Sequence, residues 1–298
     1  MSLKDLLPST TRRYKYVGIK QCIMIMCEEI YRYDREERGG SPKPHFIIEC
    51  VDERSFLECF VNSEEKVLTL SWETYDHVSQ FVILEVGSLI HENAKDRFDM
   101  IFFSWAKSFR DTASAEDAFI VPTNRRHVRG ETMSNKGDIS WMPIGRERAN
   151  VEWPTLVGEV AWSEPRQKLL KDIEFWLKNS NGQVKVAITI TVHVNGRITI
   201  EQWTTKLRPD GSMNLQTTQK MEIVRNPAPN CPRISGQFKL QFCDIFLREK
   251  KGAKTDFVLT ESDLEDIAGV VWANQFLGNS AYRRSGTFSH GEYGVTEG

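Results

Sequence analysis

Three acidic residues in the middle of the chain have the surroundings expected of metal ligands. Glu159 interrupts the apolar run LVGEVAW, Asp138 opens the run DISWMP, and Glu92 begins an amphipathic segment. An ionised carboxylate inside an apolar strand is costly unless it is paired or bound to a metal. Clustered carboxylates can bind Mg²⁺ or Mn²⁺, which polarises a phosphate and lowers the pKa of an attacking water. The three residues therefore predict a site for metal-dependent phosphodiester hydrolysis.

Basic residues near these acids could serve the same chemistry. Lys168 follows Glu159 on a predicted helix, where an ammonium could orient water or neutralise developing charge. The polar segment 122–137 is expected to be an exposed loop that could steer a phosphate backbone. Its candidate nucleic-acid-binding residues are Arg125, Arg126, Arg129 and Lys136.

Each of these residues also has a structural interpretation. Glu159 could be paired with a Lys or Arg, Asp138 could be a turn residue, and Glu92 could stabilise a helix N-terminus. Lys168 and the basic loop could simply be solvated. The tryptophans lie among apolar residues, which favours a core role over base stacking.

Hydrophobic periodicity predicts the elements that would position the site. Apolar residues at helical spacing predict helices at 18–35, 91–110, 164–180 and 260–277. Runs of β-branched and aromatic residues predict strands at 45–51, 66–72, 81–88, 138–145, 156–163, 183–194 and 197–207. Asn195-Gly196 is typical of a tight hairpin, and the strand–helix–strand order over 156–193 favours a parallel pair.

A longer stretch gives a family resemblance. Residues 153–203, WPTLVGEVAWSEPRQKLLKDIEFWLKNSNGQVKVAITITVHVNGRITIEQW, resemble the Uma2-like branch of the PD-(D/E)XK nuclease superfamily, and fungal members most of all. Upstream, GDISWMP is similar to that family's Pro-Asp strand, and LEVGSLIHENAKDRF to the segment leading into its Glu-bearing helix. The resemblance covers roughly residues 85–205.

The resemblance implies a mixed α/β fold with a restriction-endonuclease-like core, in which a central mixed sheet is flanked by helices. It implies that Glu92, Asp138 and Glu159 are the catalytic, metal-binding carboxylates for Mg²⁺ or Mn²⁺. The motif lysine should fall at residue 161, which is Ala161. Related proteins often supply this lysine from the following helix, which here carries Lys168, and the usual helix position aligns closer to Asp172.

Composition limits the remaining choices. The 298 residues carry a net charge of −2, which excludes a uniformly basic nucleic-acid coat but not a local basic groove. The six cysteines form no CxxC pair, which argues against a zinc site of that type. The cysteines Cys22 and Cys27 are expected in the core. No leader or membrane span is evident, so we expect an intracellular protein of the cytoplasm or nucleus with no membrane partner.

The expected organisation is one domain in four parts. Residues 1–84 form a helix and strands packed on the core, 85–205 the nuclease-like core, 206–278 an elaboration of it, and 279–298 a flexible tail. The leading hypothesis is a metal-dependent nuclease acting on DNA or RNA. The alternative is a catalytically inactive scaffold that binds nucleic acid or a protein, and a different chemistry on the same fold also stays open. A homodimer is compatible with the N-terminal apolar stripe.

Overall fold

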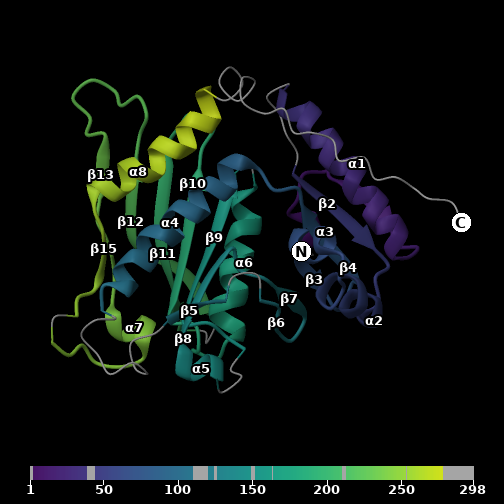
Figure 1. Ribbon diagram of the computed structural model, residues 1–298, viewed down its shortest axis with the longest axis horizontal. Helices are drawn as coiled ribbons and strands as arrows, with labels where there is room; N and C mark the ends of the chain where they lie inside the picture. The colour runs from purple at the N-terminus through teal and green to yellow at the C-terminus, as the bar shows by residue number, and fades with distance from the viewer. Residues whose placement is uncertain are drawn as a thin grey trace, which may run out of the picture.

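The computed structural model describes residues 3–38, 44–109, 120–123, 126–148, 152–162, 164–209, 213–252 and 254–277. These form two β-sheets with helices on their faces, and a separate β-hairpin (Figure 1). Within the described residues, no helix combines the length and apolar character that crossing a bilayer requires. The predicted tail at 279–298 lies outside the described residues.

The first sheet is built mainly from the N-terminal third. Its order is β1 (Arg12–Lys15), β2 (His45–Glu49), β4 (Phe81–Glu85), β3 (Trp72–Asp76), β7 (Met133–Asn135) and β6 (Val128–Arg129). Only β1 and β2 pair in parallel; the other pairs are antiparallel. Three helices accompany it: α1 (Ile19–Arg38), α2 (Glu53–Phe56) and α3 (Lys66–Ser71), with a short π-helical turn at Leu57–Val61.

The second sheet is mixed and has seven strands. Its order is β13 (Ile234–Gly236), β12 (Met213–Ile223), β11 (Ile198–Leu207), β10 (Val186–Val192), β9 (Leu156–Trp162), β8 (Ile139–Pro143) and β5 (Ile120–Pro122). Strands β9 and β10 pair in parallel and are joined by α6 (Arg166–Asn179), while all other neighbours are antiparallel. Parallel neighbours need such a crossover because a tight turn can only reverse the chain.

Helices cover both faces of the second sheet (Figure 1). Helices α4 (Leu89–Lys107) and α8 (Glu261–Trp272) share one core with alternate residues of β9 and β10, including Leu156, Val160 and Ile188. Helix α6 shares the opposite core with the intervening residues Val157 and Ala187. The hairpin of β14 (Phe238–Leu240) and β15 (Phe257–Leu259) and the short helix α7 (Phe242–Phe246) extend the first of these cores. A π-helical turn at Ala273–Leu277 follows α8, and α5 (Ile144–Arg148) follows β8.

The predicted fold class is confirmed, since a central mixed sheet is flanked by helices. The parallel β9–α6–β10 unit and the hairpin after β10 are also as expected. In that hairpin the His193 amide donates to the Arg197 carbonyl at 2.8 Å, and Gly196 adopts a positive φ of 82° that a side chain would strain.

Three local expectations were wrong. Residues 66–71 form helix α3, and the strand begins only at Trp72. The segment 122–137 contains β6 and β7, whose residues Ser134 and Asn135 are buried because they pair with β3. Cys22 is in the core, but Cys27 is exposed. Through β6 and β7, the middle of the chain contributes to the N-terminal sheet.

Candidate metal-binding site between the two sheets

Asp138, the residue directly before β8, lies opposite Glu159 of the neighbouring strand β9. Ile139 of β8 pairs with Gly158 of β9, so continuing the antiparallel register by one residue sets Asp138 beside Glu159. The backbone amide of Val160 donates to Asp138 Oδ2 at 2.8 Å, which fixes this carboxylate. The Glu159 side chain turns to the α6 face, is 7% exposed, and accepts a hydrogen bond from the indole of Trp176.

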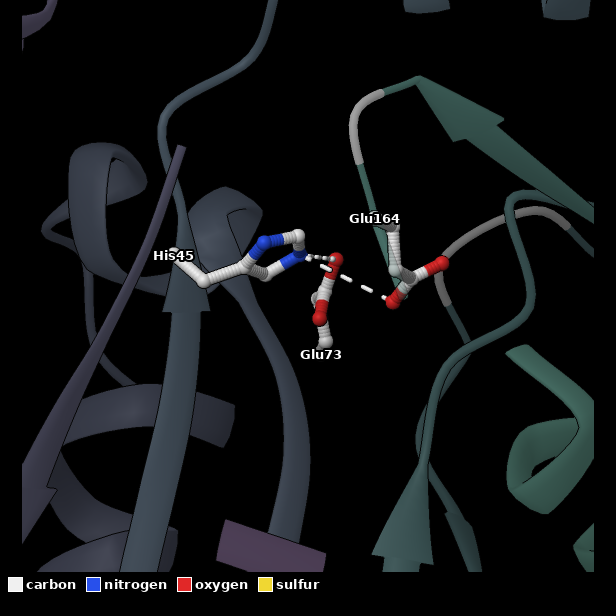
Figure 2. Close-up of side chains that lie close together, drawn as sticks. All are labelled: His45, Glu73 and Glu164. Atoms are coloured by element: carbon white, nitrogen blue, oxygen red, sulfur yellow. Dashed lines mark ion pairs between the residues drawn. The ribbon is translucent and has the colours of Figure 1, made fainter. Parts of the chain in front are cut away.

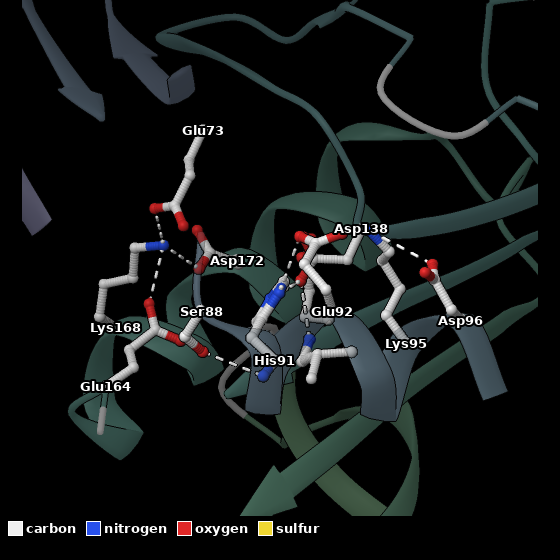
Figure 3. A network of polar contacts seen from close by, with 12 residues as sticks. Glu73, Ser88, His91, Glu92, Lys95, Asp96, Asp138, Glu164, Lys168 and Asp172 are labelled. Atoms are coloured by element: carbon white, nitrogen blue, oxygen red, sulfur yellow. Dashed lines mark hydrogen bonds and ion pairs between the residues drawn. The ribbon is translucent and has the colours of Figure 1, made fainter. Parts of the chain in front are cut away.

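A buried histidine connects Asp138 to Glu92. Ser88 caps α4 by accepting from the His91 amide at 3.0 Å, which holds the first turn of the helix in place. His91 Nε2 lies 3.2 Å from Asp138 Oδ2, and His91 Nδ1 lies 3.3 Å from Glu92 Oε1 (Figure 3). Glu92 also pairs with Lys95 one turn later. The imidazole thus links two of the three predicted metal carboxylates.

The charge state of His91 follows from these neighbours. Burial opposes its protonation, but the charges of Asp138 and Glu85 and the hydrogen bonds that His91 donates to Asp138 and Glu92 outweigh it and raise the His91 pKa well above its usual value. Burial works against ionisation of Glu92 too, yet its bonds to His91 and Lys95 lower its pKa to about 2. A protonated His91 donates from both ring nitrogens, one to Asp138 and one to Glu92.

These side chains surround a cavity of about 290 Å³ between the two sheets. Its ionisable lining comes from β3, β4, the start of α4 and the β7–β8 connection. The ionisable side chains are Glu73, Glu85, His91, Glu92, Lys136 and Asp138. Acidic groups outnumber basic ones in this lining, as a site for cations requires.

Lys168 forms its ion pairs with carboxylates other than the three predicted to bind metal. It is 3% exposed and does not line the cavity. Its Nζ lies 2.8 Å from Glu73 Oε2, 2.8 Å from Glu164 Oε1 and 3.0 Å from Asp172 Oδ2 (Figure 3). Burial opposes the charge, but the three carboxylates raise the Lys168 pKa well above its usual value. The ammonium therefore ties β3 of the first sheet to α6 on the second.

Several carboxyls around the cavity resist ionisation. Burial raises the pKa of Glu159 well above its usual value, with the charges of Asp138 and Asp172 adding to the effect. Burial also raises the pKa of Glu85 to about 8 and that of Asp172 to about 7. Crowded, desolvated carboxylates repel one another, and a bound cation would relieve that repulsion.

A compact set of ligand atoms lies at the edge of this region. Within the described residues, the only three His, Cys, Asp or Glu side chains whose ligand atoms are all within 4.8 Å of one another are His45, Glu73 and Glu164 (Figure 2). Glu92, Asp138 and Glu159 do not have this mutual spacing. Asp138 and Glu92 face the cavity, whereas Glu159 is held by Trp176 behind them.

The predicted nucleic-acid-binding residues have diverse surroundings. Arg129 is about half exposed and pairs with Glu53. Lys136 is 7% exposed; its Nζ donates to the Thr69 carbonyl at 2.8 Å and lies 4.5 Å from the centre of the Trp72 ring. Arg126 is partly exposed at a turn, and Arg125 lies outside the described residues. Their role in binding nucleic acid stays a prediction.

Sequence reasoning missed His91 as a linking residue, and it missed His45, Glu73, Glu85 and Glu164 altogether. A signal was present for the last of these, because Glu164, Lys168 and Asp172 recur every four residues and so face one side of a helix. Nothing local indicated that Glu73 would reach that face from another sheet.

Comparisons with known proteins add little to this description. No protein-family model matches the chain, and a search of curated proteins found no relative. Among solved structures, the chain is similar to a protein from Anabaena variabilis described as a candidate nuclease belonging to DUF820. That similarity has a TM-score of 0.32 and 12% sequence identity, and it covers 48% of this chain and 75% of the other. A TM-score of this size does not establish a shared fold.

Proposed function

We propose that this protein hydrolyses phosphodiester bonds of DNA or RNA with the help of Mg²⁺ or Mn²⁺. The observation that carries the proposal is the position of Asp138, directly before β8, beside Glu159 of β9, with Glu92 brought to Asp138 through His91. Acids on adjacent strands next to a helix-borne acid suit a metal-dependent nuclease site.

Two of the three carboxylates are well placed to bind Mg²⁺ or Mn²⁺. Asp138 and Glu92 are acidic side chains, 25% and 33% exposed, that face the same cavity. Carboxylate oxygens and water are the ligands that Mg²⁺ and Mn²⁺ prefer. Glu159 has one oxygen occupied by Trp176, which leaves its other oxygen as a potential ligand. A bound cation would polarise the phosphate and lower the pKa of the attacking water.

The chain's own residues would orient the site. His91 holds Asp138 and Glu92 in place, as partners of ligating carboxylates commonly do. Lys136 is the lysine that lines the cavity, so it is better placed than Lys168 to contact a bound phosphate. Lys168 would act indirectly, through the carboxylates of Glu73 and Asp172.

The test is cleavage of single-stranded DNA, duplex DNA and RNA by the purified full chain with MgCl₂ or MnCl₂. Asp138→Asn and Glu92→Gln should reduce cleavage to background, and His91→Asn should reduce it by about 10–100-fold. The matched control is Glu174→Gln, which removes an acid of α6 that pairs with Lys171 and Lys178. Cleavage that survives Asp138→Asn at the wild-type rate would exclude this site.

One observation favours a second candidate, an inactive scaffold that binds nucleic acid or protein. Ala161 is buried where the motif lysine would be, and Lys168 is enclosed by three carboxylates instead of facing the cavity. This candidate predicts no metal-dependent cleavage by the wild type, together with binding that is unchanged in Asp138→Asn. Binding is measured by fluorescence anisotropy with labelled oligonucleotides.

A further inference from the structure

Beside the proposed catalytic carboxylates lies a second set of ligand atoms with different chemistry. His45 begins β2, Glu73 is on β3, and Glu164 precedes Pro165 at the start of α6. His45 Nε2 lies 3.4 Å from Glu73 Oε1 and 3.8 Å from Glu164 Oε1 (Figure 2). One imidazole and two carboxylates therefore converge from three separate segments.

The backbone of β3 turns Glu73 toward this point. Trp72 pairs with Leu84 and Thr74 with Ile83, so Glu73 is an extra residue in the β3–β4 ladder. Such a bulge re-aims a side chain and is common next to functional sites. Glu73 Oε2 contacts Lys168 while Glu73 Oε1 faces His45, so the two oxygens serve different partners.

Two buried atoms at this point lack hydrogen bonds. The His45 side chain is 7% exposed, and neither its Nε2 nor Glu164 Oε1 has a hydrogen-bond partner of good geometry. Buried polar atoms without hydrogen bonds are rare in folded proteins and call for an explanation. Glu164 Oε1 does lie 2.8 Å from Lys168 Nζ, so the ammonium neutralises part of the charge from one side. On the other side, His45 Nε2 faces the two carboxylates at 3.4 Å and 3.8 Å, longer than a good hydrogen bond, so a shared cation could take the place of these contacts.

We propose that His45, Glu73 and Glu164 bind a transition-metal cation of the Zn²⁺ class. The ligand atoms are all within 4.8 Å of one another, a spacing that suits bonds of about 2.0–2.2 Å to a shared ion. An imidazole ligand favours Zn²⁺ over Mg²⁺, which prefers oxygen ligands alone. The ion would join β2 and β3 of the first sheet to the β9–α6 connection of the second. Its role would be to hold the two sheets together beside the cavity.

The test is calorimetric titration of ZnCl₂ into the purified full chain, followed by thermal unfolding with and without Zn²⁺. The wild type should bind one equivalent and gain thermal stability. His45→Gln and Glu164→Gln should each weaken binding by about 100-fold and lose the gain. X-ray absorption of the Zn²⁺-loaded wild type should show one imidazole ligand, and His45→Gln should lack it. Circular dichroism of the metal-free variants establishes that they are folded.

The control separates this site from the proposed catalytic one. Asp138→Asn should retain full Zn²⁺ binding while losing nuclease activity, because Asp138 is not among the three ligands. If a variant loses nuclease activity but still binds Zn²⁺, the zinc proposal is unaffected. If a variant loses Zn²⁺ binding but keeps nuclease activity, the proposed function is unaffected. The proposal is overturned if the wild type binds no Zn²⁺, which would mean that Lys168 already serves as the cation. It is equally overturned if folded His45→Gln and Glu164→Gln bind as tightly as the wild type.

Discussion

Replacing Lys168 by methionine should destabilise the protein strongly at neutral pH. Methionine fills a similar volume but leaves Glu73, Glu164 and Asp172 without the ammonium that lies within 3.0 Å of each. Removing one partner of a buried ion pair costs about 3–5 kcal/mol, because the remaining charge stays desolvated. The lower end applies here, since the pKa of Asp172 is already about 7 and this carboxyl carries only part of its charge. We expect a loss of about 3 kcal/mol in the free energy of unfolding at pH 7.

The destabilisation caused by Lys168→Met should be smaller in acid than at neutral pH. The folded-state pKa of Lys168 is raised, so its stabilisation is fully present below its unfolded pKa and is lost only in strong alkali. Acid therefore leaves the wild-type ammonium in place. In Lys168→Met, acid protonates the uncompensated carboxylates and removes their repulsion. The difference between variant and wild type should shrink to about 1 kcal/mol at pH 5.

The assay is urea unfolding followed by tryptophan fluorescence at pH 7 and pH 5. Lys171→Met is the matched control, because Lys171 is on the same helix with its side chain 44% exposed and should cost under about 0.5 kcal/mol. Adding Asp172→Asn to Lys168→Met should recover about 1 kcal/mol or more, because one repelling charge is removed. A loss at pH 7 below about 1 kcal/mol, or an equal loss at both pH values, would refute the reasoning.

Three further changes test other parts of the structure. Burial, followed by nearby positive charge, lowers the pKa of His127 to about 4. The free energy of unfolding of the wild type should therefore fall by about 1–2 kcal/mol between pH 6.5 and pH 4. Urea unfolding of His127→Phe should show a smaller fall over the same range. Burial opposes ionisation of Asp256, but the Phe242 amide and two lysines lower its pKa to about 2. In urea unfolding, Asp256→Asn should therefore lower the free energy of unfolding by about 1 kcal/mol at pH 7 and leave it unchanged near pH 2. A Cβ on Gly137 would lie 2.7 Å from Val157 Cγ2, so Gly137→Ala should lower thermal stability by about 1–3 kcal/mol, and adding Val157→Ala should restore part of it.

Local periodicity was sufficient for much of the fold. Helix α4 was predicted at 91–110 and runs from Leu89 to Lys107, because its apolar residues recur at helical spacing and Ser88 caps its start. The run KVLTLSW was misassigned because five apolar or β-branched residues are too few to separate helix from strand. In the structure Leu68 is fully buried while Leu70 is about half exposed, which is one face of a short helix.

The candidate site was only partly predictable for a different reason. Asp138 and Glu159 could be assigned to one site from the sequence, because both are acids of predicted strands that follow one another in the chain. Glu73 could not be placed, because its position depends on a bulge in β3 and on the docking of one sheet against the other. The contact between Glu73 and Lys168 joins residues 95 positions apart, and the local spacing of residues in the sequence does not indicate contacts over that distance.

The two proposals share a physical origin in the charge balance at the junction of the sheets. Lys168 and His45 face three carboxylates on one side, and His91 with Lys95 faces Asp138 and Glu92 on the other. Glu85 and Glu159, whose pKa values are raised, can each lose a proton when a cation binds, so each side can accept a cation without excess positive charge. The ligand types then separate the two ions, because the oxygen-only set favours Mg²⁺ or Mn²⁺ and the imidazole-containing set favours Zn²⁺. Titrating both metals into Asp138→Asn and His45→Gln should therefore abolish one binding event in each variant, and a single event lost in both would mean one shared site.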